Sequence, residues 1–320
     1  MANIKDIAKM AGVSVTTVSR VLNQQPYVSA EKKQAVLEAI KKSNYKPNIN
    51  AIHLSTGKTF LVGVVVPFSN HPYFGYLIEG IAKEALKHNY KLVLFQTNYE
   101  EERELEALTM LKLKQIDALI ICSRNCSWET IKDYISFGPI VLCEDARDKQ
   151  VSSTFIDHYK SFTIALDYLY EKGHREIGFC IGRKSGTSSE QRYLAYRDFL
   201  NKIKQPFKKE FIFYDCYQLD DGEKVVNKLQ SMGHRPSALL VTSDQVAAGI
   251  LACAKEHTIT VPDQLAILGF DNQPIAKVMN ITTLEIPLFE VGRKLFNQAM
   301  QTETILYEEV EVKLIERKTV

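Results

Sequence analysis

Side chains that can bind a polyanion gather near the N-terminus. A helix is predicted over 15–22, and one side of it carries four polar residues, Thr16, Thr17, Ser19 and Arg20. Residues 1–58 hold nine basic and three acidic side chains, a net charge of +6, whereas the other 262 residues hold 31 basic and 35 acidic ones. A basic segment on a mildly acidic chain predicts a polyanionic partner for that segment alone.

Other reactive patterns are weak. Cys122 and Cys126 could offer two metal ligands, but no second cysteine or histidine pair has a suitable spacing. The chain has no Gly-x-x-x-x-Gly-Lys-[Ser/Thr] phosphate loop, no Gly-x-Ser-x-Gly elbow and no Gly-x-Gly-x-x-Gly after a strand. We therefore expect no metal site, no cofactor and no enzymatic activity, and we expect the six cysteines to be reduced, buried thiols.

Three helices are expected to position the basic segment. Asn3, Ser14 and Ser29 are each followed by apolar residues at helical spacing, which predicts helices over 4–11, 15–22 and 30–43 with these residues as N-caps. Gly12 ends the first helix, so the first two meet across a tight turn.

From residue 60 onward, apolar strands alternate with amphipathic helices, which is typical of parallel sheets with helices on both faces. Strands are expected over 61–66, 92–96, 118–122, 140–143, 153–156, 177–181, 238–241 and 266–270, and helices over 73–87, 102–113, 159–170, 191–203 and 245–255. This count exceeds one sheet of typical size, so we expect two similar lobes, with a second sheet that begins at Ser153. Ligands of such sheets bind at the carboxyl ends of the strands, and two facing lobes would enclose one cleft.

The order of residues near the N-terminus resembles the DNA-binding head of the LacI family of bacterial repressors. About twenty positions match within 48 residues, in the segments Ile4-Lys5-Asp6-Ile7-Ala8, Ala11-Gly12-Val13-Ser14, Thr17-Val18-Ser19-Arg20-Val21-Leu22-Asn23, Val28-Ser29 and Asn44-Tyr45-x-Pro47-Asn48. Matches continue to the C-terminal half, among them Gly173-His174-Arg175, Ser243-Asp244 and Gly269-Phe270-Asp271-Asn272, so the resemblance covers essentially the whole chain.

The resemblance implies a fold in three parts. An all-α helix-turn-helix head is expected over 1–45, with the helix-turn-helix at about 4–23, followed by a hinge over 46–58. The body, 59–320, is expected to be an α/β structure of two doubly wound parallel-sheet lobes like those of periplasmic binding proteins. The lobes would span about 60–157 and 158–281, with the C-terminal segment crossing between them.

The resemblance also implies which residues contact DNA. Val15, Thr16 and Arg20 match base-reading positions, and Thr17, Asn23, Tyr27 and Ser29 match positions that contact the DNA backbone. Ala51 and Leu54 match hinge positions that order on specific DNA and insert a leucine into the minor groove. Asn50 departs from the usual apolar residue there and would bury less surface between two hinges.

A small effector is expected between the lobes. The matching positions are Tyr73, Phe74, Arg192, Tyr217 and Asp271, together with Glu144 or Asp145 and with Ser243. A guanidinium and a carboxylate can bind paired hydroxyls while an aromatic face packs on a sugar ring, so a sugar or sugar derivative is the first choice and a purine the second. Ser243 and Ile286 replace longer amide side chains that are common at these positions, which leaves the ligand open.

The function predicted from these features is a DNA-binding transcriptional regulator, a repressor whose operator affinity depends on an effector. We expect a homodimer on a pseudo-palindromic double-stranded operator. No leucine heptad follows Arg317, so we do not expect a tetramer. The alternatives are a sugar-processing or phosphoryl-transfer enzyme and a sugar transport receptor. No export signal is present and the longest apolar run, 60–68, is far shorter than the roughly 18 residues of a membrane span, so we expect a cytoplasmic protein without membrane contact.

Replacing Leu54 with Ala tests the hinge assignment. We expect operator binding to weaken by about 1–3 kcal/mol while binding to random duplex is kept, because non-specific binding depends mainly on phosphate charge. Titration of labelled operator and random duplexes measures both affinities. Equal losses on the two duplexes would show that Leu54 does not act as a wedge.

Overall fold

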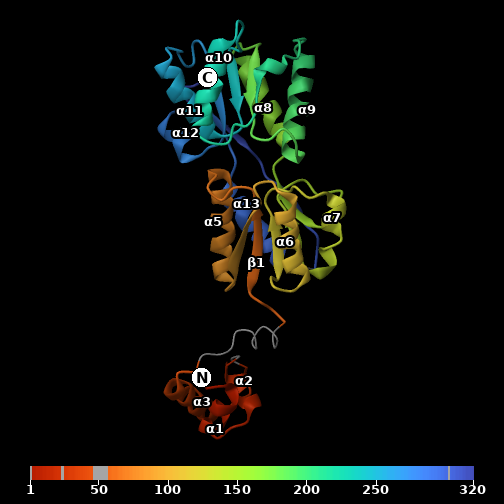
Figure 1. Cartoon of the computed structure of the whole chain (residues 1–320), viewed down its shortest axis with the longest axis vertical. Coiled ribbons are helices and arrows are strands. Elements are labelled where there is room, and N and C mark those ends of the chain that lie inside the picture. Colours follow the sequence, from red (N-terminus) through yellow and green to blue (C-terminus); the bar gives the residue numbers. More distant parts are fainter. Residues whose placement is uncertain (1, 23–24, 46–56, 302) are drawn as a thin grey trace. The chain divides into compact units, whose positions relative to one another are not determined.

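The structure is a computed structural model that describes residues 2–22, 25–45, 57–301 and 303–320 (Figure 1). The chain divides into two compact units, Met1–Thr59 and Phe60–Val320. Three residues of the predicted DNA contacts, Asn23, Ala51 and Leu54, lie outside the described residues.

The first unit is a head of three helices around a small core. The helices are α1 (Ile4–Ala11), α2 (Val15–Leu22) and α3 (Ala30–Ser43), as predicted. The core consists of six buried side chains, Ile7, Ala8, Val18, Val21, Val36 and Ala39.

Local hydrogen bonds fix where these helices begin and end. Asn3 and Asp6 form a capping box, and Gly12 ends α1 in the left-handed conformation with φ 64°. Ser14 Oγ accepts a hydrogen bond from Thr17 N at 3.2 Å, and the side chain of Ser29 accepts one from Lys32 N. The three predicted N-caps are confirmed.

The second unit contains two six-stranded sheets, each the centre of one lobe. The first sheet has the order β11-β5-β4-β3-β1-β2 and the second the order β12-β10-β9-β8-β6-β7. The strands of the first are β1 (Leu61–Val66), β2 (Lys91–Gln96), β3 (Ala118–Ile121), β4 (Ile140–Leu142), β5 (Ser152–Phe155) and β11 (Tyr307–Glu309). Those of the second are β6 (Ile177–Cys180), β7 (Ile212–Phe213), β8 (Ala238–Val241), β9 (Ala266–Asp271), β10 (Thr282–Glu285) and β12 (Lys313–Ile315).

Helices connect the strands and cover the sheets. They are α5 (Pro72–Lys87), α6 (Glu101–Lys112), α7 (Trp128–Lys132), α8 (His158–Glu171), α9 (Thr187–Lys202), α10 (Asp221–Ser231), α11 (Asp244–Glu256), α12 (Pro274–Val278) and α13 (Leu288–Met300), with short 3₁₀ turns at Ile135–Phe137 and Lys209–Phe211. The strand pairs are parallel except for β10 with β12. A helical head followed by two parallel-sheet lobes confirms the predicted fold class.

The C-terminal segment contributes to both lobes. Helix α13, blue in Figure 1, lies in the first lobe among elements from the orange and yellow part of the chain, and β11 pairs with β5 there. Strands β10 and β12 complete the second sheet. The expectation of a second sheet beginning at Ser153 is wrong, because β5 pairs with β4 of the first sheet before the chain enters the second lobe.

Helices α5 and α13 approach closely through two glycines. A Cβ added at Gly80 would lie 2.1 Å from the carbonyl oxygen of Phe289, and one added at Gly292 would lie 2.2 Å from that of Leu77. Both obstacles are backbone atoms, which cannot rotate away. The contact therefore requires glycine on each helix.

Replacing Gly80 with Ala should destabilise the first lobe by about 1–3 kcal/mol, because the new methyl group forces the two helix backbones apart. Gly75→Ala in the same helix is the matched control: its added Cβ meets no atom within 4 Å, and it should be neutral or stabilise by about 0.5–1 kcal/mol. Urea unfolding followed by circular dichroism compares the variants. A Gly80→Ala protein as stable as the parent would contradict the close contact.

Candidate functional site

Helix α2 presents its predicted DNA-reading side chains on the side opposite the head core. Val18 and Val21 are buried, whereas Thr16 and Arg20 are exposed and Val15 is 41% exposed. Three side chains of α2 are thus available to a partner from one face of a helix that its core holds in place.

The residues predicted to contact the DNA backbone are less uniform. The Oγ1 atom of Thr17 lies 2.9 Å from Ser14 Oγ, at the N-terminus of α2. Tyr27 is 91% exposed and has a positive φ of 131°, and Ser29 is exposed at the N-cap of α3. The structure therefore places Thr17, Tyr27 and Ser29 at the surface of the head.

A cavity of about 670 Å³ opens at the carboxyl ends of the parallel strands of both sheets. All seven residues predicted to bind an effector line it: Tyr73, Phe74, Glu144, Arg192, Tyr217, Ser243 and Asp271. Tyr73 and Phe74 lie in the first turn of α5 on the first lobe, and Arg192 lies on α9 of the second. The structure thus brings together residues that are almost 200 positions apart in the chain.

Asp271 is a buried carboxyl group at the end of β9. It is 5% exposed, accepts a hydrogen bond from Gln273 Nε2 at 3.0 Å and has a φ of 95°, a backbone conformation that costs free energy for a residue other than glycine. Burial raises the pKa of Asp271 to about 7, against the opposing effects of the Arg192 charge and the Gln273 hydrogen bond. The carboxyl group therefore changes charge near neutral pH.

Arg192 faces the same cavity with part of its guanidinium unused. Its Nη2 lies 3.4 Å from His158 Nδ1 and its guanidinium carbon 5.6 Å from the centre of the Phe270 ring, whereas its Nε is buried with no partner among the described residues. Burial, with the Arg192 charge, lowers the pKa of His158 well below its ordinary value, so the imidazole is neutral. Arg192 and Asp271 offer donors and an acceptor to the same space.

Aromatic rings form much of the remaining wall. Tyr73 packs edge-on against Phe74 at 5.1 Å between ring centres, and Phe68 contacts both Tyr99, at 5.4 Å, and Tyr217, at 5.5 Å. Phe68 belongs to the first lobe and Tyr217 to the second, so this contact crosses the cavity. Aromatic faces next to hydrogen-bonding groups are suited to ligands with one apolar and one polar side.

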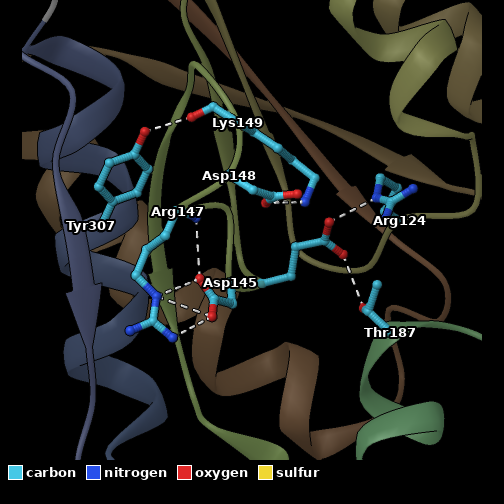
Figure 2. Close-up of polar contacts among 8 residues, drawn as sticks. Arg124, Asp145, Arg147, Asp148, Lys149, Thr187 and Tyr307 are labelled. Carbon is cyan, nitrogen blue, oxygen red and sulfur yellow. Dashed lines mark hydrogen bonds and ion pairs between the residues drawn. The ribbon is translucent and has the colours of Figure 1, made fainter.

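Glu144 already has a protein partner for each of its oxygens. Arg124 Nε donates to Oε1 at 2.9 Å, and Thr187 Oγ1, from the other lobe, donates to Oε2 at 3.0 Å, as Figure 2 shows. Strands β3 and β4 pair with Ile121 opposite Leu142, which places the segments that carry Arg124 and Glu144 side by side. Asp145, the alternative in the sequence, forms an ion pair with Arg147. Glu144 thus lines the cavity chiefly as a link between the lobes.

Several lining residues were absent from the sequence prediction. Arg183 follows β6 and donates from both Nη atoms to the carbonyl oxygen of Arg124 at 3.3 Å, across the cavity. Tyr99 follows β2, and His158 begins α8. The available signal was position: each lies just beyond a predicted strand, at the edge where ligands bind. Ser243 was predicted, and its Oγ is buried without a partner in the described chain.

The part of the chain that the structure describes has neither a cluster of metal ligands nor a helix suited to cross a membrane. No three His, Cys, Asp or Glu side chains come together there as metal ligands would. No helix of the described ranges has the length and apolar character needed to cross a membrane.

Comparison with known proteins gives matches along the whole chain. Residues 3–48 match the model for bacterial regulatory proteins of the lacI family, and residues 59–319 match that for periplasmic binding proteins and the sugar binding domain of the LacI family. The chain is 42% identical to the uncharacterized HTH-type transcriptional regulator YkvZ of Bacillus subtilis, with both chains fully covered.

Two solved structures are similar in fold. One is the lac repressor dimer bound to operator and the anti-inducer ONPF, with a TM-score of 0.87, 22% identity, and 99% of this chain and 98% of that one covered. The other is a LacI family regulator from Lactobacillus casei with bound sucrose, with a TM-score of 0.75, 25% identity, and coverage of 81% and 99%.

Replacing Asp271 with Asn should change how stability depends on pH. Between the ordinary pKa of 3.8 and about 7 the folded parent holds more protons than the unfolded chain, so its free energy of unfolding falls as pH rises through this window. The amide of the Asp271→Asn variant cannot titrate, so the variant should gain stability relative to the parent toward pH 8, by an amount on the order of 4 kcal/mol. Urea unfolding at pH 5 and pH 8 measures this, with Asp263→Asn, a change of an exposed carboxylate, as the control. If the stability of the parent and of Asp271→Asn changed with pH in parallel, the pKa of Asp271 would not be raised in the folded protein.

Proposed function

Because the chain belongs to the LacI family of bacterial transcriptional regulators, we propose that a sugar or sugar derivative bound in the cavity sets its affinity for a DNA operator. The chain is a DNA-binding transcriptional regulator with a helix-turn-helix head, and its relatives are regulators rather than enzymes. The identity of the effector, its site residues and the residues that read DNA are the parts of this function that we propose.

The observation that carries the effector proposal is the placement of Arg192 and Asp271 within electrostatic range of each other in one cavity, beside aromatic rings. A guanidinium donates to hydroxyl oxygens and a carboxyl oxygen accepts from hydroxyl hydrogens, so the pair suits neighbouring hydroxyls of a sugar. The faces of Tyr73 and Tyr217 can pack on the apolar side of the ring. The sugar binding domain in the name of the matched family and the sucrose in the Lactobacillus casei structure support this choice.

A purine is the second candidate, because its flat ring can also pack against aromatic side chains of the cavity. Phe68 packs edge to face against both Tyr99 and Tyr217, and a flat ring can pack against such aromatic side chains. Ser243 offers only a short hydroxyl, which leaves more room beside it than an amide would. Purines therefore belong in a screen for the effector.

We propose that the head reads DNA with Val15, Thr16 and Arg20 on α2 and contacts the DNA backbone through Thr17, Tyr27 and Ser29. Arg20 can form paired hydrogen bonds with guanine, and Val15 can contact a thymine methyl group. One helix of eight residues reads few base pairs, so a homodimer on a pseudo-palindromic operator is expected, like the operator-bound dimer of the lac repressor.

The cavity gives a physical route from effector to DNA affinity. Contacts between the lobes pass beside it, including Thr187 with Glu144 and Arg183 with the carbonyl of Arg124. A ligand that touches both lobes favours one angle between them, and the lobe angle can set the spacing of two heads in a dimer. Coupling free energies of about 1–3 kcal/mol, or about 5- to 150-fold in affinity, are typical of such systems.

A thermal-shift screen of sugars, sugar phosphates and purines identifies the effector, because a ligand at 100 times its dissociation constant stabilises by about 2.7 kcal/mol. Operator titration with and without that ligand then tests the site. Arg192→Ala and Asp271→Ala should abolish the response of operator affinity to the ligand and keep operator binding itself, because the head folds around its own core. Arg175→Ala, a change on the outside of the second lobe, should respond like the parent. An Arg192→Ala protein with the response of the parent would remove Arg192 from the effector site.

A further inference from the structure

The charges that line the cavity do not balance once their partners are assigned. Five basic side chains line it, Arg124, Arg147, Lys149, Arg183 and Arg192, and five acidic ones, Glu144, Asp145, Asp148, Asp157 and Asp271. Equal numbers would give a neutral cavity if each group were free. The contacts of each group decide what is left for a ligand.

Four of the acidic side chains are occupied by the protein. Figure 2 shows Glu144 with Arg124, Asp145 with Arg147 and Asp148 with Lys149. Asp157 caps α8 by accepting from Lys160 N at 2.8 Å. Three of the five basic groups are thereby neutralised by adjacent carboxylates, and the dipole of α8 offsets part of the charge of Asp157 at its N-terminus.

Arg183 has no carboxylate within 4.0 Å among the described residues. Its two Nη atoms share one carbonyl oxygen, that of Arg124, at 3.3 Å, and its guanidinium lies 4.4 Å from the centre of the Tyr99 ring. A guanidinium has five N–H donors, so these two long hydrogen bonds use few of them. Gly186 leaves room for this placement, since a Cβ there would lie 2.2 Å from Nη2 of Arg183. The charge is held in position without being neutralised.

Arg192 adds a second guanidinium without a carboxylate in ion-pair range in the described chain. Asp271 in the cavity wall interacts with it electrostatically, but burial raises the pKa of Asp271 to about 7, so a large fraction of this carboxyl group is neutral at neutral pH. Tyr99 lies within electrostatic range of both arginines. The wall around Tyr99 therefore carries net positive charge.

The start of α9 adds hydrogen-bond donors on the same side. This 16-residue helix begins after Gly186, which provides no side-chain cap, and Thr187, Ser188 and Ser189 of its first turn line the cavity. Unpaired amides at a helix N-terminus favour an anion. Arg183 stands three residues before this turn, and Ser189 Oγ donates to its carbonyl oxygen at 2.9 Å.

We propose that the effector carries an anionic group, a phosphate or a carboxylate, which Arg183 binds at the first turn of α9 while the hydroxyls of the same molecule bind Arg192 and Asp271. The inference rests on the proposed function and narrows its ligand class to a sugar phosphate or a sugar acid. Arg183 determines specificity in this arrangement, because its charge distinguishes the anionic ligand from its neutral parent sugar.

Inorganic phosphate is the first probe, titrated into the full-length protein at constant ionic strength against chloride and followed by thermal shift and calorimetry. We expect saturable binding that Arg183→Gln weakens at least about tenfold, whereas Arg183→Lys, which keeps the charge, retains most of it. Arg175→Gln is the matched control. Arg175 is also an arginine that stacks on a tyrosine, Tyr170 at 3.7 Å, but it lies outside the cavity, so phosphate binding should be unchanged.

Matched pairs of neutral and anionic sugars, such as glucose with glucose 6-phosphate and glucose with gluconate, are the second probe. The anionic member of a pair that binds should bind at least about tenfold more tightly than the neutral one, and Arg183→Gln should remove this preference. The proposal of an anionic effector would be overturned if phosphate showed no saturable binding, or if Arg183→Gln bound phosphate as tightly as the parent.

The same data separate the two proposals. A neutral sugar that binds in the cavity and changes operator affinity, with no gain from an anionic group, supports the proposed function and overturns this inference. If no ligand of the screen changes operator affinity, the proposed function fails as well. Circular dichroism of each variant confirms that a loss of binding does not arise from unfolding.

Discussion

Burial of both faces of two parallel sheets is the constraint on which the rest of the body depends. Two neighbouring strands are parallel only if the chain crosses back between them, most often through a helix, so the carboxyl ends of the strands meet at one edge. Strands such as Ala118–Ile121 and Ala238–Val241 are buried throughout and carry no polar side chain. Polar side chains are therefore placed just beyond the strand ends, and two facing edges make one polar cavity.

The electrostatics of the cavity follow from this placement. Side chains at the strand ends are partly removed from water, which raises the pKa of Asp271 and Tyr73 and lowers that of His158. Groups that lie near the mouth of the cavity, such as Asp145 and Arg147, form an ion pair with each other instead. The cavity thus combines a rim whose charges are satisfied by the protein with a deeper part, around Arg192 and Asp271, whose charges are not.

Much of this could be predicted from the sequence. The helices of the head have strong N-caps and clear periodicity, and most of the eight predicted strands are largely apolar, so local signals were sufficient. Four strands were missed, Ile212–Phe213, Thr282–Glu285, Tyr307–Glu309 and Lys313–Ile315, because two to four residues carry too little periodic signal and depend on pairing with distant segments. The effector residues came from family positions. The roles of Glu144 and Arg183 could not be predicted from the sequence, because they depend on which group from the opposite lobe lies within hydrogen-bond distance.

The path of the C-terminal segment has a consequence for how the two lobes can be handled. Strand β10 belongs to the second sheet, and the chain then passes to the first lobe, where it forms α13 and the edge strand β11. It finally returns to the second sheet, where β12 is the edge strand beside β10. No single cut in the gene separates the lobes into independent proteins, since either fragment would lack strands that its sheet needs. The body must therefore be expressed as one piece, and neither lobe can be exchanged with a relative as one continuous segment.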